Sequence, residues 1–201
     1  MDSLGEKFKV ARQSSGWTIE DVSKRIKLPK YIIEEVSKIQ EILKKCNLNF
    51  KWVKAENTHL TLKFLGNTDN AKLEKAKEII AQTAKDFSGF KVKLESFGFF
   101  PNERRPRVFF ISTTAHQILK SIADKLEDEL KPLGFKKESR FKSHITLARI
   151  KSTKDIDCLK EKLKSIELKG SFPVKEITLY ESTLTPKGAI YDVIFNASFA
   201  S

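Results

Sequence analysis

Two short segments hold most of the residues that could do chemistry in this 201-residue chain. They read Thr-His-Leu-Thr-Leu at 58–62 and Ser-His-Ile-Thr-Leu at 143–147, and they contain two of the three histidines. An imidazole can donate or accept a proton near neutral pH, and a threonine hydroxyl can donate a hydrogen bond to an anionic oxygen. Two such segments facing each other across a cleft would hold one phosphate between a proton donor and a proton acceptor.

The spacing within each segment predicts a strand with one chemical face and one apolar face. In a β-strand, residues two apart point the same way, so His59 and Thr61 share a face and the two leucines share the other. The same holds for His144 and Thr146. Because the two segments are nearly identical, we interpret them as an internal duplication. Two buried, structural histidines in a duplicated fold remain an alternative.

The sequence predicts no metal site and no cofactor. A metal bound by the two histidines would need a third ligand, and no carboxylate recurs at matching positions in both segments. Cys46 and Cys158 have neither Cys nor His at ligand spacing, so there is no zinc motif. We expect them to be two unreactive free thiols in a cytosolic protein.

The composition indicates one domain with at most a small appendage. Hydrophobic residues make up 40% and charged residues 32%, enough for a core and a polar surface. No apolar run approaches the ~18 residues of a membrane span. The first residues lack the features of a signal peptide. We therefore expect a cytoplasmic, monomeric protein that does not bind membranes.

The net charge of +12 favours an anionic partner. A domain this basic attracts polyanions, nucleic acid above all. The alternative is a lysine-rich solvated surface, since the lysines are spread along the chain.

The pattern of apolar residues and turn signals predicts an α+β fold. Strands are expected at 50–53, 58–65, 90–99, 108–113, 143–150, 174–182 and 190–199, and helices at 30–45, 70–86, 117–130 and 155–164. Each half thus gives a motif strand, a helix and an antiparallel strand pair. We predict two lobes of antiparallel sheet that face each other, with helices outside.

Residues 1–28 are predicted to form a helical appendage to a domain at 29–201. One helix would contain Leu4, Phe8 and Ala11, and a second would begin at Thr18 and run through Ile26. The segment is similar to the start of a repressor-type helix-turn-helix, although we favour the role of a cap on the main domain.

The paired motifs resemble those of the 2H phosphoesterase superfamily, and more closely those of the RNA 2′,3′-cyclic phosphodiesterases, also called 2′-5′ RNA ligase-like proteins. The residues that carry the resemblance are His-Leu-Thr-Leu-Lys-Phe-Leu-Gly at 59–66 and Ser-His-Ile-Thr-Leu-Ala-Arg at 143–149, with support from 99–107 and 182–191. Members begin with an apolar strand followed by Leu-Pro. Here Leu28-Pro29 is present, and the strand either comes from residues 25–27 or is replaced by helices.

The resemblance implies metal-independent hydrolysis of RNA 2′,3′-cyclic phosphate ends to a 2′-phosphate. His59 would be the acid for the 3′ oxygen and His144 the base for water, although the residues alone leave this assignment open. Thr61 and Thr146 would hold the non-bridging oxygens. The reverse reaction would join RNA ends through a 2′-5′ bond.

Five further residues are candidates for substrate binding: Arg149, Lys63, Phe100, Tyr191 and Arg107. Lys63 lies four positions after His59 and would share its face. Arg149 would reach the cleft only through a twist or a bulge. Phe100 and Tyr191 could contact a base, and Arg107 belongs to a basic turn that could follow an RNA backbone. Solvent exposure is the alternative for Lys63 and the turn, and core packing for Phe100. His116 is expected on the surface.

Two other functions stay open. One is a nucleic-acid-binding protein with a helix-turn-helix-like N-terminus and an inactive or weakly active cleft. The other is an enzyme of the same class that acts on small cyclic nucleotides instead of RNA ends.

Overall fold

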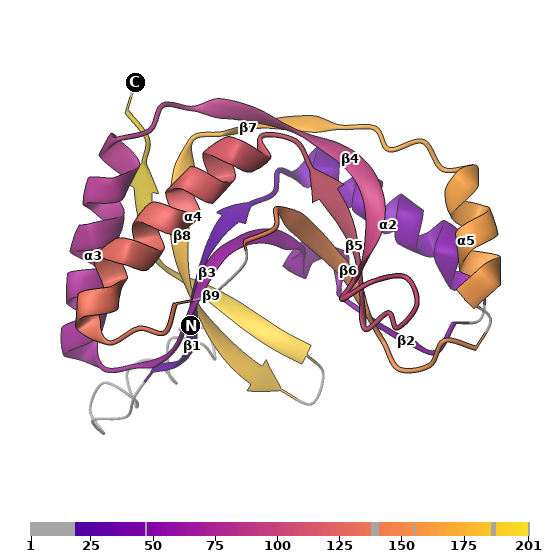
Figure 1. The fold of residues 1–201 in the computed structure, drawn as a ribbon, viewed down its shortest axis with the longest axis horizontal. Helices are drawn as coiled ribbons and strands as arrows, with labels where there is room; N and C mark the ends of the chain where they lie inside the picture. The colour runs from indigo at the N-terminus through magenta and orange to yellow at the C-terminus, as the bar shows by residue number, and fades with distance from the viewer. Residues whose placement is uncertain (1–18, 47, 138–140, 155, 186–187, 201) are drawn as a thin grey trace, which may run out of the picture.

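Nine strands form one curved antiparallel sheet within the part of the chain that the structure describes (Figure 1). The structure is a computed structural model that describes residues 19–46, 48–137, 141–154, 156–185 and 188–200. The strand order is β7-β4-β5-β6-β3-β1-β8-β9, and β2 pairs with β6 off this path. The strands are β1 Ile19–Lys27, β2 Phe50–Trp52, β3 His59–Thr68, β4 Phe90–Phe100, β5 Val108–Thr113, β6 His144–Ile150, β7 Ser171–Val174, β8 Glu176–Thr185 and β9 Gly188–Ser198.

Helices pack on the outside of this sheet, as predicted. They are α2 Lys30–Lys44, α3 Asn70–Lys85, α4 His116–Leu130 and α5 Ile156–Lys164, with 3₁₀ turns η1 Ala55–Asn57 and η2 Lys131–Leu133. In Figure 1, α3 and α4 lie beside one part of the sheet and α2 and α5 beside the other. The predicted α+β fold with antiparallel sheets and outer helices is confirmed.

The two motif strands divide the sheet into two lobes. One lobe holds β3 with β1, β8 and β9, and the other holds β6 with β2, β5, β4 and β7. A single residue pair, Leu60 with Ile145, joins β3 to β6. The lobes therefore meet where the two histidine motifs begin.

The lobes do not coincide with the two halves of the sequence. The β4–β5 hairpin follows β3 along the chain, yet β5 pairs with β6. The β8–β9 hairpin follows β6, yet β8 pairs with β1 beside β3. Each half thus supplies the hairpin that flanks the other half's motif strand, an exchange that the repeat did not reveal.

The apolar faces predicted from alternation and helical spacing form the core. The motif residues Leu60, Ile145 and Leu147 are 0% exposed. Each helix contributes a stripe at three- and four-residue spacing, such as Ile32, Val36, Ile39 and Leu43 of α2. Burying one such side chain contributes about 1.5–3 kcal/mol, so these stripes fix the helices against the sheet.

The second helix predicted for the N-terminus is wrong. Ile19–Lys27 forms β1, an antiparallel strand that lies between β3 and β8. Its register with β3 shifts in three places, and such irregular pairing hides the two-residue period that marks a strand in sequence. Pairing on both sides outweighs the weak local preference for a helix. The strand expected before Leu28-Pro29 is therefore present.

The first predicted helix, with Leu4, Phe8 and Ala11, falls within residues 1–18 and so lies outside the described residues. The helix-turn-helix reading also needed a helix where β1 lies. It therefore fails for Ile19–Lys27.

The prediction of two free thiols is also wrong. Cys46 follows α2 and Cys158 lies in α5, and the two form a disulfide with their Cα atoms 5.8 Å apart. They are separated by 112 positions, and only the packing of α2 beside α5 brings them together. The strand β7 was likewise not predicted, since its alternation extends over only four residues and includes a proline, which weakens the signal for a strand.

None of the described helices combines the length and the apolar character needed to cross a membrane.

Candidate active site

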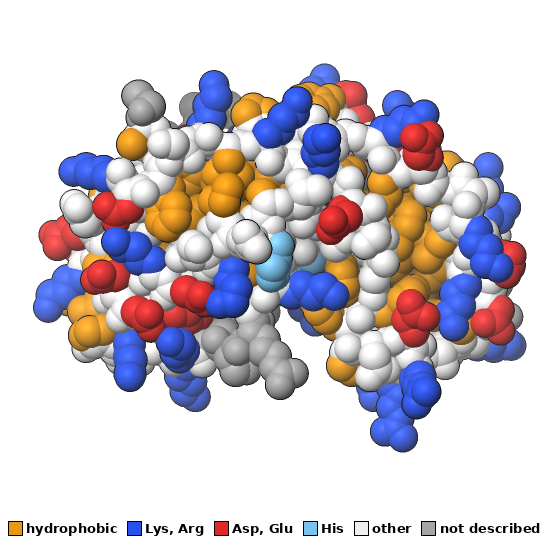
Figure 2. All heavy atoms as spheres, turned by 45° about the horizontal axis from the view of Figure 1, so that its top comes forward, with side chains coloured by type: hydrophobic (Ala, Val, Ile, Leu, Met, Phe, Trp, Pro, Cys, Tyr) orange, Lys and Arg blue, Asp and Glu red, His pale blue; other side chains and the backbone are white. Residues whose placement is uncertain are grey.

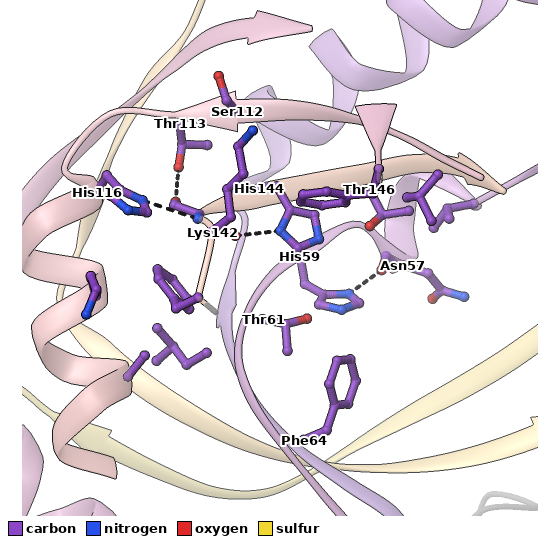
Figure 3. A pocket seen from close by; sticks show the side chains of 18 of the residues that line it. Asn57, His59, Thr61, Phe64, Ser112, Thr113, His116, Lys142, His144 and Thr146 are labelled. Carbon is purple, nitrogen blue, oxygen red and sulfur yellow. Dashed lines mark hydrogen bonds between the residues drawn. The ribbon is translucent and has the colours of Figure 1, made fainter. Parts of the chain in front are cut away.

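A cleft of about 1540 Å³ lies between the two lobes, and both histidine motifs line it. Figure 2 shows histidine side chains in the hollow between the two parts of the molecule, with Lys or Arg beside them. Figure 3 shows the imidazoles of His59 and His144 next to each other, with Thr61 and Thr146 on either side. The four residues expected to do chemistry are thus brought together.

The pairing of Leu60 with Ile145 explains this arrangement. In antiparallel register, the positions next to that pair place His59 opposite Thr146 and Thr61 opposite His144. Because Leu60 and Ile145 point into the core, the residues on either side of them point into the cleft. Each histidine therefore has the other motif's threonine as its cross-strand neighbour.

Both imidazoles are held by a backbone carbonyl two residues earlier in the chain. His59 Nδ1 lies 2.7 Å from the oxygen of Asn57, and His144 Nδ1 lies 2.6 Å from the oxygen of Lys142. A carbonyl only accepts hydrogen bonds, so Nδ1 carries the proton in each ring. In the neutral rings, Nε2 is then the nitrogen with the lone pair. Both histidines thus have the same tautomer.

Aromatic rings from the exchanged hairpins support each imidazole. Tyr191 of β9 contacts His59 edge-on at 5.5 Å between ring centroids. Phe100 of β4 contacts His144 in the same manner at 4.9 Å, and Phe110 at 5.4 Å. Phe100 and Tyr191 also line the cleft, as expected for residues that contact substrate.

Gly98 allows Phe110 to support His144. A Cβ at position 98 would lie 2.5 Å from the ring of Phe110, so any other residue there would displace that ring. The close approach of β4 to this ring therefore requires glycine.

Burial lowers the pKa of His144 below its ordinary value of 6.5. Loss of hydration disfavours the charged ring and is the largest cause; the hydrogen bond to the Lys142 carbonyl acts in the opposite direction, and the nearby Lys142 charge lowers the pKa further. Lys142 extends its ammonium over Phe100 at 5.5 Å and over Phe110 at 5.0 Å. These contacts favour the neutral form of His144.

A β-bulge interrupts both motif strands at the same position. In β3, the register passes from Thr61 to Lys63 while the partner strand advances by one residue, which leaves Leu62 as the extra residue. In β6, it passes from Thr146 to Ala148, which leaves Leu147 as the extra residue. A bulge reverses the alternation that follows it. The residue five positions after each histidine therefore returns to the cleft.

Phe64 and Arg149 are the two residues that the bulges turn into the cleft. The prediction that Arg149 needs a bulge to reach the cleft is confirmed. Phe64, 45% exposed, was missed, although it follows His59 by the same five positions by which Arg149 follows His144. A comparison of the two motifs at that position could have found it.

Lys63 does not lie on the cleft face, contrary to prediction. Its side chain is fully buried; Nζ lies 2.6 Å from Glu127 Oε2 and donates to the carbonyl of Lys136 at 2.8 Å. The bulge at Leu62 turns it away from His59, because strict alternation fails there. Its ammonium is held by protein groups and cannot bind substrate.

Arg107 is not brought to the site either. Its exposed side chain lies outside the lining of the cleft. Its backbone N–H donates to the Phe100 carbonyl across the turn, and its carbonyl accepts from Ile150 N–H of β6. His116 is exposed, as expected, but it also lines the cleft. Its ring stacks on Phe141 at 5.9 Å, and its Nδ1 lies 3.5 Å from the backbone nitrogen of Ser143.

Among the described residues, no three His, Cys, Asp or Glu side chains gather as ligands for a metal ion. The disulfide removes both cysteines from consideration as ligands.

A family model described as LigT-like phosphoesterase matches the chain twice, over residues 26–110 and 111–191. The chain belongs to the LigT-like phosphoesterase family. Each match contains one of the histidine motifs, so this family assignment agrees with the duplication seen in sequence. The predicted relationship to the 2H phosphoesterases is confirmed, and the chain is an enzyme of this class.

Curated relatives match most of this chain. A protein of Methanocaldococcus jannaschii named RNA 2′,3′-cyclic phosphodiesterase is 40% identical over 172 residues, 84% of this chain and 95% of its own length. A protein of Thermotoga maritima with the same name is 33% identical over 184 residues, 89% of this chain and 92% of its own.

Solved structures share the LigT-like fold. The protein TT0787 of Thermus thermophilus superposes with a TM-score of 0.74 at 26% identity, covering 89% of this chain and 97% of its own. Apo E. coli LigT superposes with a TM-score of 0.73 at 23% identity, covering 92% and 99%. The arrangement of antiparallel strands and outer helices is thus shared with these proteins.

Proposed function

We propose that the chain hydrolyses 2′,3′-cyclic phosphate at RNA ends to a 2′-phosphate, with His59 as acid and His144 as base. The observation that carries the proposal is the pair of imidazoles in one cleft, each with Nδ1 bonded to a carbonyl. The relatives named RNA 2′,3′-cyclic phosphodiesterase, at 40% and 33% identity, support the substrate.

The reaction needs two proton transfers on opposite sides of phosphorus. Neutral His144 Nε2 takes a proton from water as the water oxygen bonds to phosphorus. The bond from phosphorus to O3′ breaks, and protonated His59 gives its Nε2 proton to O3′. Each transfer contributes about 10²–10⁴-fold. The lowered pKa of His144 supports its role as the base, because burial keeps the ring neutral.

Thr61 and Thr146 bind the non-bridging oxygens in this proposal. Each lies opposite the other motif's histidine, so the two hydroxyls flank a phosphate placed between the imidazoles. They stabilise the charge that grows on these oxygens in the transition state. Arg149 adds a positive charge to the lining of the cleft, and the exposed ring of Phe64 offers a surface for a base.

The near-symmetry of the site also suits the reverse reaction. Both rings have the same tautomer, so exchanging their protonation states exchanges acid and base. We propose that, in 2′-5′ joining, the 5′-hydroxyl of a second RNA replaces water: His144 takes its proton as its oxygen bonds to the phosphorus of the 2′,3′-cyclic phosphate, and the bond from phosphorus to O3′ breaks as His59 gives O3′ a proton. In the reverse step, which cleaves the 2′-5′ bond back to the cyclic phosphate, the two histidines exchange roles. Hydrolysis is favoured in water, since water is in excess.

Incubation with an oligonucleotide that ends in a 2′,3′-cyclic phosphate tests the proposal. We expect a 2′-phosphate product, and turnover that survives EDTA, since both proton transfers are assigned to histidines. His59→Ala or His144→Ala should lower kcat by about 10²-fold or more, with an unchanged circular dichroism spectrum.

His116→Ala is the matched control, because its ring stacks on Phe141 instead of facing a second imidazole. A 3′-phosphate product would contradict the assignment of His59 as acid for O3′ and would indicate that the two histidines have the opposite roles. Loss of turnover in EDTA, or full activity of both alanine variants, would overturn the mechanism.

A further inference from the structure

The segment that connects the two lobes carries cations along the cleft. It begins with β2, which pairs with β6, and continues through η1 to His59. Lys51 is the direct cross-strand partner of Arg149, and both line the cleft. Lys54 lines it three positions further along, just before the turn in which Asn57 holds the His59 ring. We call Lys51 and Lys54 the β2 lysines.

The pairing of Lys51 with Arg149 is unfavourable by itself. Like charges at directly paired positions of an antiparallel sheet repel each other. In the described part of the chain, no carboxylate forms an ion pair with either side chain. Lys54 approaches Glu56 at 3.9 Å, but both side chains are well exposed, at 60% and 69%, so the pair contributes little. An anion from outside the chain would relieve this repulsion.

The side of the cleft formed by α4 and the segment after η2 carries both lysines and carboxylates. There the lysines of α4 and of the segment after η2 have carboxylate partners: Lys120 pairs with Asp124, and Lys137 with Asp128 at 2.8 Å. These pairs also line the cleft, so that side presents cations and anions together. Within the described lining, a polyanion therefore meets positive charge without a close carboxylate partner on the β2 side and at Lys142, whose ammonium lies over Phe100 and Phe110 beside His144.

Trp52, the residue after Lys51, faces away from the β2 lysines. Its half-buried ring packs against Phe50 and Phe109 and lies 6.0 Å from the ammonium of Lys44 in α2, on the face opposite the pair of Lys51 and Arg149. The cleft face of this segment is therefore basic, and lysines that follow the backbone are typical of sites for single-stranded nucleic acid.

We infer that the RNA strand on the 5′ side of the cyclic phosphate runs over Lys51 and Lys54, so that the enzyme prefers oligonucleotides to mononucleotides. This inference rests on the proposed function, because the cyclic end must lie between His59 and His144. The phosphodiester groups next to that end then meet the β2 lysines, and Arg149 remains beside the terminal nucleotide.

Two substrates test the strand path: a mononucleotide 2′,3′-cyclic phosphate and a pentanucleotide with the same 3′ end. For the wild-type enzyme, kcat/KM should be higher for the pentanucleotide, through a lower KM. Lys51→Glu and Lys54→Glu should lower the ratio of the two kcat/KM values about tenfold, as expected for one lost charged hydrogen bond each. Both side chains are exposed, so the variants should fold.

Binding of the 2′-phosphate product oligonucleotide, measured by fluorescence anisotropy at several salt concentrations, gives a readout separate from turnover. Each alanine substitution at a β2 lysine should reduce the slope of log affinity against log salt by about 0.7. Lys151→Ala is the matched control, because Lys151 is exposed nearby but lies outside the cleft lining.

Equal kcat/KM for both substrates, or a ratio that falls only with Lys120→Glu, would overturn the β2 path while leaving the proposed function intact. Failure of the wild-type enzyme to hydrolyse either substrate would overturn the proposed function and the strand path with it.

Discussion

Each histidine of the site owes its chemistry to contacts with its own and neighbouring strands. The carbonyl two residues earlier fixes the proton on Nδ1, and an aromatic ring from an exchanged hairpin fixes the ring plane. The two sites differ in electrostatics. His144 is surrounded by Phe100, Phe110 and the Lys142 ammonium, and this environment favours the neutral form of its ring.

We predict that the pH profile of kcat/KM has an acid limb below 6.5 that reports His144. A base works only when it is neutral, so activity falls as the pH falls through its lowered pKa. Lys142→Ala removes a charge that lowers this pKa and uncovers the rings beside His144, so the limb should move to higher pH. The substitution leaves the backbone carbonyl of residue 142 in place, so His144 Nδ1 keeps its hydrogen bond.

Steady-state measurements of kcat/KM between pH 4 and 8 would locate the acid limb of the wild-type enzyme and that of Lys142→Ala. A limb that moves to lower pH in Lys142→Ala would contradict the assigned cause. The same lowered pKa makes the unfolded chain bind the proton more readily, so stability should also decline as the pH drops below 6.5.

At the scale of elements, the paired bulges determine which residues line the cleft. They occur after the threonine in both motif strands, so Phe64 and Arg149 face the cleft while Lys63 turns inward. Lys63 then links β3 to α4 through Glu127, and to the segment that leads toward His144 through the Lys136 carbonyl. The buried lysine is thus part of the framework that sets the two motifs against each other.

We predict that Lys63→Met lowers the free energy of unfolding by about 3–5 kcal/mol, because it leaves the Glu127 carboxylate buried without this partner. Replacing both residues, as Lys63→Met with Glu127→Leu, should recover most of the loss, since two apolar groups of similar size can pack there.

Urea denaturation of the two variants and of Lys77→Met gives the comparison. Lys77 forms an ion pair with Glu74 on the surface of α3, so its replacement should change stability by less than about 1 kcal/mol. An equal effect of Lys63→Met and Lys77→Met would show that the buried pair is not structural.

At the scale of the whole molecule, the exchange of hairpins makes the two lobes interdependent. Tyr191, from the end of the chain, supports His59, and Phe100, from the first half, supports His144. Neither histidine site can form from its own half of the sequence. The disulfide between Cys46 and Cys158 adds a link between α2 and α5 on the outside of the β6 lobe.

We predict that reduction of this disulfide lowers the stability of the fold by about 2–4 kcal/mol, since it closes a long loop in the unfolded chain. Turnover at 25 °C should be unchanged, because no described residue of α2 or α5 lines the cleft.

Urea midpoints with and without reductant measure this effect. The variant Cys46→Ala with Cys158→Ala should match the reduced protein and be insensitive to reductant. A midpoint that reductant leaves unchanged would mean that the disulfide contributes nothing to stability.

The sequence by itself determined the chemical face of the site and most of the elements. Alternation placed His59 and Thr61 on one face and Leu60 in the core, and did the same for His144, Thr146 and Ile145. These signals are local: the period of a strand or helix is set by residues within a few positions. The helices of the main domain and its longer strands were predicted to within a few residues for the same reason.

Tertiary structure alone decided where Lys63 points, which hairpin supports which histidine, that residues 19–27 form a strand, and that Cys46 meets Cys158. A bulge depends on register with a partner strand, and the partners of β1, β5 and β8 lie far away in the chain. Such choices follow from the free energy of pairing and packing over the whole domain, which no local pattern encodes.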